Sequence, residues 1–146
     1  INFHMAKVLI QMVKLTEIGK EYIHVLEETK TQNGTYARLR FWGLIEPMGE
    51  DAMTKIGIKK SSGYWRVTPL GAEFAINKIK IIESKFIYNN NVYANKDYKP
   101  KFISIKDALN NKFNYSELMD GFKAWDSIVY TLKMTQGLIP HQKELF

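Results

Sequence analysis

The chain has no cysteine, few prolines and glycines, and no long hydrophobic run. Among its 146 residues there are 0 Cys, 4 Pro and 9 Gly. The lack of cysteine excludes a disulfide framework, a zinc ribbon and a thiol nucleophile, and it leans slightly towards the cytosol, where disulfides are rare. The low proline and glycine content excludes collagenous and low-complexity chains. No apolar run approaches the roughly 18 residues of a membrane span, and the amino end lacks a signal-peptide pattern.

The residues that are present fit one globular domain. Hydrophobic residues make up 45% of the chain and charged residues 25%, a balance that excludes intrinsic disorder. A chain of this length can bury roughly two thirds of its unfolded surface, so it needs no metal to fold. The chain begins at Ile1 rather than Met, which leaves room for an upstream segment.

The charge is positive and unevenly placed. The chain has 21 basic and 15 acidic residues, a net charge of +6, and residues 107–146 are slightly acidic while the rest is basic. A pI of about 9.4 is typical of proteins that bind a polyanion. A lysine-rich surface that serves only solubility gives the same total, so charge alone leaves both interpretations open.

The first third of the chain predicts three helical segments and a strand. Apolar residues recur at helical spacing over residues 3–15, which predicts an amphipathic helix. Residues 22–25 are β-branched and aromatic enough for a short strand, followed by a short helix over 26–30. One continuous helix over 17–29 also fits the spacing, and we favour the strand and short helix.

Residues 31–43 predict a helix with signals at both ends. Thr31 can act as the N-cap, and Gly43 supplies the left-handed residue that commonly ends a helix. Tyr36, Leu39 and Trp42 lie three apart and therefore share an inward face. Residues 44–46 are expected to be extended.

The next segment predicts a basic loop, a strand and a helix. Residues 48–63 are polar with several lysines, and residues 64–67 follow as a strand. Thr68 as N-cap and Pro69 at the first helical position then predict a helix to about Asn77.

The last part of the chain has a different pattern. Residues 85–94 predict a β-hairpin around three asparagines, and residues 102–105 predict a third short strand. One helical turn is expected over 107–111. An apolar stripe over residues 115–132 predicts a single amphipathic helix, although Gly121 weakens it.

Two of these segments together resemble the winged helix-turn-helix family. The run LRFWGLIE over residues 39–46, a polar loop, and GYWRVTPLGAEF over residues 63–74 are similar to MarR-like and PadR-like members, and look most like uncharacterised winged-helix proteins of bacteriophages and prophages. The resemblance covers residues 3–78 and implies a recognition helix, a β-wing and double-stranded DNA as partner. It does not extend to the family's dimerisation helices, and the wing loop here is longer.

The resemblance and the residue types together give a candidate DNA interface. Arginine can read guanine, and Asn or Gln can read adenine, by paired hydrogen bonds in the major groove. Basic residues of a wing contact the phosphate backbone. We expect base contacts from Gln32, Asn33, Thr35 and Arg38, and backbone contacts from Lys55, Lys59, Lys60 and Arg66.

The aromatic residues of the predicted hairpin and third strand have two interpretations. Phe86, Tyr88, Tyr93 and Phe102 lie among lysines, and aromatic side chains on a basic sheet can stack on single-stranded bases. We favour the other interpretation, in which they pack against the body of the protein.

Sequence signals for catalysis are few. His4, His24 and His141 lie far apart in the sequence, and none has a second ligand at metal-binding spacing. The adjacent acidic pairs at residues 27–28 and 50–51 do not converge on a helix face, and no glycine-rich phosphate loop or nucleophile elbow occurs. We expect no enzyme activity, no metal and no cofactor, although a nuclease built from scattered carboxylates is not excluded.

These observations predict an α+β fold with a winged helix-turn-helix core. We expect that core over residues 1–80, and an accessory segment with a small β-hairpin, a further strand and a C-terminal amphipathic helix over 81–146. The expected function is double-stranded DNA binding in phage or bacterial transcription regulation or replication, in the cytoplasm of the bacterial or phage-infected cell. A homodimer through the C-terminal helix is a further expectation. A protein-interaction module and a single-strand binder are the alternatives.

Overall fold

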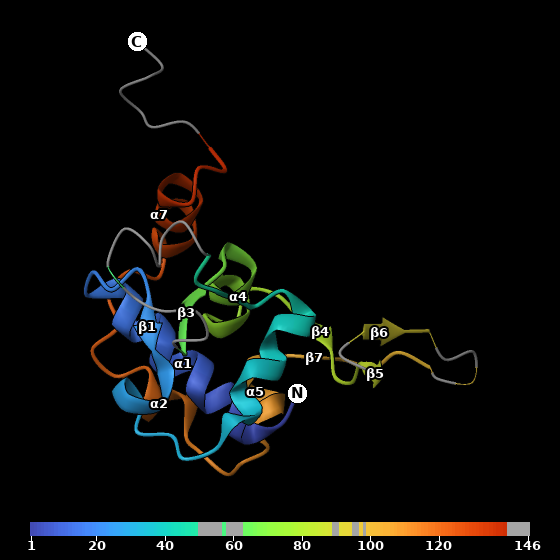
Figure 1. The fold of residues 1–146 in the computed structure, drawn as a ribbon. Helices are drawn as coiled ribbons and strands as arrows, with labels where there is room; N and C mark the ends of the chain where they lie inside the picture. Colours follow the sequence, from blue (N-terminus) through green and yellow to red (C-terminus); the bar gives the residue numbers. More distant parts are fainter. Residues whose placement is uncertain (50–56, 58–62, 89–90, 95–96, 98, 140–146) are drawn as a thin grey trace.

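The first predicted helix lies at the centre of the core. The computed structural model describes residues 1–49, 57, 63–88, 91–94, 97 and 99–139 (Figure 1). Helix α1 (Phe3–Glu17) begins at Asn2, whose side chain accepts a hydrogen bond from the Met5 amide at 3.0 Å. This helix packs against several other elements, which explains why it is buried on more than one side. Its buried residues are Met5, Ala6, Val8, Leu9, Ile10, Met12 and Val13.

A three-stranded antiparallel sheet packs on α1. Strands β1 (Ile23–His24), β2 (Ile45–Pro47) and β3 (Tyr64–Val67) have the order β1-β3-β2. Helix α2 (Val25–Glu28) follows β1 directly, so the predicted strand and short helix are confirmed and one continuous helix over 17–29 is excluded. The break has a local cause, because Gly19 has a φ of +102° that a helix does not accommodate.

The predicted helix over 31–43 differs from the expectation in type and start. It is a 3₁₀ helix, η1 (Gly34–Trp42), and its N-cap is Asn33 rather than Thr31. The Thr31 hydroxyl instead lies 2.8 Å from the hydroxyl of Thr29. The predicted end is confirmed, since Gly43 has a φ of +73° and its amide donates back to Arg40.

Helix α4 (Pro69–Ala75) starts as predicted. The Thr68 hydroxyl accepts a hydrogen bond from the Gly71 amide at 3.0 Å, and Pro69 occupies the first helical position. The helix ends slightly earlier than expected, because Asn77 adopts a left-handed φ of 67°.

Four short strands follow α4. Strands β4 (Ile81–Ile82) and β7 (Phe102–Ile103) form one antiparallel pair, and β5 (Phe86–Tyr88) and β6 (Asn91–Tyr93) form another. The predicted hairpin is therefore confirmed, and it extends outward from β4 and β7 (Figure 1).

The expectation that the aromatic residues of these strands pack on the body is wrong for Phe102 in β7. Its side chain is 58% exposed while the next residue, Ile103, is buried, because successive side chains of a strand point to opposite faces. The side chains of Phe86, Tyr88 and Tyr93 lie outside what the structure describes.

The predicted helix over 115–132 is divided. Before it, the helical turn predicted over 107–111 is present as α5 (Ile105–Leu109), which begins and ends two residues earlier. Helix α6 (Tyr115–Leu118) is short, and α7 (Ile128–Thr135) follows a non-helical connection in which Gly121 has a φ of +82°. The Glu17 carboxylate accepts hydrogen bonds from the amides of Lys123 and Ala124, both at 2.6 Å, and so fixes this connection against the end of α1. The buried face of α7 lies against α4, and the predicted homodimer through this helix stays a prediction.

One hydrophobic cluster joins described residues from Met5 to Leu132. It contains residues of the sheet and of α1, together with later residues such as Ile103, Leu109 and Phe122. The protein is thus a mixed helix and strand, α+β fold whose core continues past residue 80. Within the described residues, no helix is both long and apolar enough to cross a membrane.

Candidate nucleic-acid interface

The 3₁₀ geometry of η1 arranges its side chains in three rows. Because this helix has three residues per turn, residues three apart lie directly above one another. The inner row is Tyr36, Leu39 and Trp42, and Leu39 is fully buried against α1. Burial also raises the pKa of Tyr36 above its ordinary value. The predicted inward face is therefore confirmed.

The two outer rows carry arginines at the surface. Arg38 stands in the row of Thr35, and Arg40 stands in the row of Gly34 and Ala37. Both arginines are exposed, and the Arg40 guanidinium lies 4.8 Å from the centre of the Phe41 ring. The two cations thus flank the buried row on either side, and the structure adds Arg40 to the predicted set. Its charge was visible in the sequence, but its position depends on the helix type.

Two of the predicted base-contacting residues have a structural role. The Asn33 side-chain oxygen accepts hydrogen bonds from the amide of Thr35, at 2.7 Å, and from the hydroxyl of Thr35. These contacts begin the helix and use the Asn33 oxygen and the Thr35 hydroxyl. The Asn33 amide nitrogen remains a free donor in these contacts. Gln32 is exposed, and its side chain makes no hydrogen bond within the described part of the chain.

Arg66 is separated from the other predicted residues by its ion pairs. It pairs with Glu46 on the neighbouring strand and with Glu21 at 3.6 Å, and its guanidinium lies 5.3 Å from the Tyr22 ring. These two carboxylates compensate the charge of Arg66. In this arrangement Arg66 links β3 to β2 and is not a free cation for a phosphate. Lys55, Lys59 and Lys60 lie outside the described residues.

A pocket of about 260 Å³ lies at the start of η1. His4, Lys7 and Val8 of α1 form one wall, and residues 29–33, Thr35 and Tyr36 form the other. No aspartate or glutamate contributes to the lining, which contains two lysines, one histidine and several hydroxyl and amide groups. Such a lining suits an anion, because its charged side chains are cationic and its neutral groups can donate. The predicted Gln32, Asn33 and Thr35 all belong to it.

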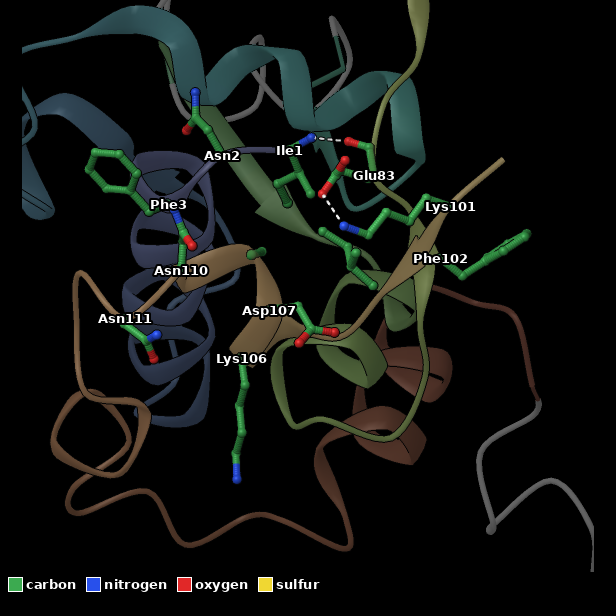
Figure 2. A pocket seen from close by; sticks show the side chains of 12 residues that line it. Ile1, Asn2, Phe3, Glu83, Lys101, Phe102, Lys106, Asp107, Asn110 and Asn111 are labelled. Atoms are coloured by element: carbon green, nitrogen blue, oxygen red, sulfur yellow. Dashed lines mark hydrogen bonds and ion pairs between the residues drawn. The ribbon is translucent and has the colours of Figure 1, made fainter. Parts of the chain in front are cut away.

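A second pocket of about 580 Å³ is lined by the first three residues of the chain and by residues near β4, β7 and α5, and its charges are compensated (Figure 2). Lys101 pairs with the Glu83 carboxylate at 3.7 Å, and the Ile1 amino group donates to the Glu83 backbone carbonyl. Hydrogen bonds from Ser104 lower the pKa of Asp107, so its carboxyl group is charged. One oxygen of this carboxylate already accepts the Ser104 amide. Lys106 extends away from Lys101 in Figure 2, and its ammonium lies 5.4 Å from the Tyr115 ring. This larger pocket consequently has little net charge to offer a ligand.

The histidines that the structure describes lie apart from one another. His4 lines the pocket beside η1, whereas His24 lies in β1 next to the Tyr64 ring. No three histidine, aspartate or glutamate side chains of the described ranges gather as metal ligands.

Comparisons with known proteins give no relative. No protein-family model, no curated protein and no solved structure matches this chain.

Proposed function

We propose that this protein binds double-stranded DNA without catalysis and uses η1 as its reading helix. The observation that carries the proposal is the charge of the surface around η1. Residues 29–43 contain Lys30, Arg38 and Arg40 and no carboxylate. All three cations are exposed, and the apolar row of the same helix is buried. A basic surface of this kind is the electrostatic footprint of a nucleic-acid-binding protein.

The element order supports the same proposal. A helix, a strand, two helical segments and two strands follow one another, with the third strand in the centre of the sheet. This is the arrangement expected of a winged helix-turn-helix, with η1 in the position of the recognition helix. At about 2.0 Å per residue, the 9 residues of η1 extend roughly 18 Å. A single helix fits the major groove, which is about 12 Å wide.

Individual residues receive distinct roles in this proposal. Arg38 and Arg40 contact guanine edges or phosphates, and Gln32 contacts adenine with its free amide. Asn33 and Thr35 mainly hold the start of η1 in place. The basic residues 55, 59 and 60 stay predicted phosphate contacts of the wing. Arg66 acts as a positioning residue for the strands that carry the wing.

Charge reversal on η1 tests the proposal. Duplex affinity is measured by fluorescence anisotropy for the wild type, Arg38→Glu and Arg40→Glu. Each variant is expected to lose at least about fivefold in affinity, because a guanidinium contact contributes about 1–3 kcal/mol. Both side chains are exposed, so the circular dichroism spectrum and the Tm should stay unchanged.

Lys123→Glu is the matched control. It changes the net charge by the same amount, but Lys123 is placed next to Glu17 at the far end of α1 from the pocket. Equal losses of duplex affinity in all three variants would contradict a specific role of η1. The proposal would also be contradicted if the affinity of the wild type did not change with salt concentration. Tighter binding of a single-stranded oligonucleotide of the same sequence would instead favour single-strand binding by the β5–β6 hairpin and Phe102 of β7.

We assign the protein to the bacterial or phage-infected cytoplasm, where its DNA would be accessible.

A further inference from the structure

Lys30, at the edge of the pocket beside η1, has an unusual backbone conformation. Its φ is 54°, in the left-handed region directly after the C-cap of α2. Glycine or asparagine normally occupies this position, since other side chains are strained there. The other described non-glycine residues with positive φ are asparagines: Asn77, Asn110 and Asn111. A lysine in this conformation is an outlier among the described residues.

The surroundings of Lys30 leave its charge uncompensated. Within the described residues no carboxylate pairs with it. Nearby Glu28 is occupied, because it pairs with Lys20 and accepts a hydrogen bond from the amide of His24 at 2.9 Å. Lys30 is exposed, and it is one of the residues that line the pocket.

Lys7 of α1 is the second lysine that lines the pocket. The Lys7 ammonium lies 4.6 Å from the centre of the Phe113 ring, a cation–π contact that restricts the side chain without neutralising its charge. The hydroxyl of Thr29, another residue of the lining, donates a hydrogen bond to the Val25 carbonyl at 2.6 Å. The exposed Gln32 amide is a free donor. The pocket therefore combines two lysines with a neutral donor.

We propose that this pocket binds one phosphate group of the DNA backbone, with Lys30 as the main contact and Lys7 opposite it. The inference rests on the proposed function and specifies where the duplex is held relative to η1. A phosphate fixed at the start of η1 sets the register of the helix in the groove, so that Arg38 and Arg40 meet base edges. It also explains why a lysine, rather than a glycine, occupies a left-handed position.

Lys30→Gly is the central test because it removes the cation and the strain together. The Tm of this variant is expected to stay unchanged or to rise by up to about 4 °C, so a failure to fold does not confuse the result. The slope of log affinity against log salt is expected to fall by about 0.9, the value for one lost phosphate contact. Lys30→Arg keeps the charge and should keep the wild-type slope. Lys123→Gln removes a cation elsewhere and should also keep it.

The outcomes separate this inference from the proposed function. If the wild type binds no duplex, the proposed function fails. If it binds but Lys30→Gly keeps the full slope, only the phosphate site is overturned. A titration with inorganic phosphate, followed by the amide signals of residues 29–33, distinguishes a free anion from a backbone phosphate. We expect the amide signals not to shift in a saturable way when phosphate is added without DNA. The assignment to a backbone phosphate would be overturned if phosphate alone saturated these signals and Lys30→Gly left the salt dependence of DNA binding unchanged.

Discussion

Replacing Gly71 by alanine should destabilise the protein strongly, because α4 lies against the backbone of Leu44 at this point. A Cβ added at Gly71 would stand 2.0 Å from the Leu44 carbonyl oxygen, whereas ordinary contacts begin at 3.4 Å. The two groups would have to separate by about 1.4 Å, the difference of these values. The obstacle is backbone, so no side chain can rotate away.

The size of the effect follows from three contributions. Overpacking costs about 1–3 kcal/mol, and a backbone clash belongs at the upper end. The Leu44 carbonyl also accepts the Thr68 amide at 3.1 Å, and losing that hydrogen bond costs about 1 kcal/mol. Alanine's better helix propensity returns about 1 kcal/mol. The expected loss is about 3 kcal/mol, equivalent to a fall in Tm of roughly 6–12 °C for a chain of this size.

Urea denaturation followed by far-UV circular dichroism measures this loss as a lower midpoint with an unchanged m-value. Gly34→Ala is the matched control, because Gly34 is also helical and an added Cβ there meets nothing within 4 Å. Its stability should change by no more than about 0.5 kcal/mol. If Gly71→Ala were as stable as Gly34→Ala, the close packing of α4 on Leu44 would be refuted.

Two further predictions concern the base of the hairpin and the start of α5. Trp42→Phe removes the indole donor that bonds the Ile82 carbonyl at 2.7 Å, and should lower the free energy of unfolding by about 1–3 kcal/mol in urea denaturation. Asp107→Asn tests the lowered pKa of a capping carboxylate that accepts the Ser104 amide. Because the folded pKa lies below the ordinary 3.8, the stabilisation is present above that pH and disappears as the pH falls through the folded value. Urea denaturation from about pH 7 to about pH 3 should therefore show the wild type losing its advantage over this variant, and a constant difference would contradict the role of the charge.

The candidate interface was partly visible in the sequence. Arg38 and Gln32 could be selected because polar residues interrupt an apolar spacing, and the structure leaves both exposed. Arg40 and Lys30 were missed, since their positions depend on a 3₁₀ helix and on a left-handed turn. Arg66 could not be judged from sequence, because its partners Glu21 and Glu46 are distant along the chain.

The sequence by itself determined the elements whose causes are local. These elements are the helix begun by the Thr68 cap, the helix ended by Gly43 and the amphipathic helix α1. Each depends on residues within about one or two turns, so the residue types are sufficient to predict it. The tertiary structure decided the rest. Residues 115–132 have a helical pattern, yet the Glu17 carboxylate, 106 residues before Lys123, binds the amides that continuing the helix would have used. Such contacts join distant parts of the chain, and only the folded core brings them together.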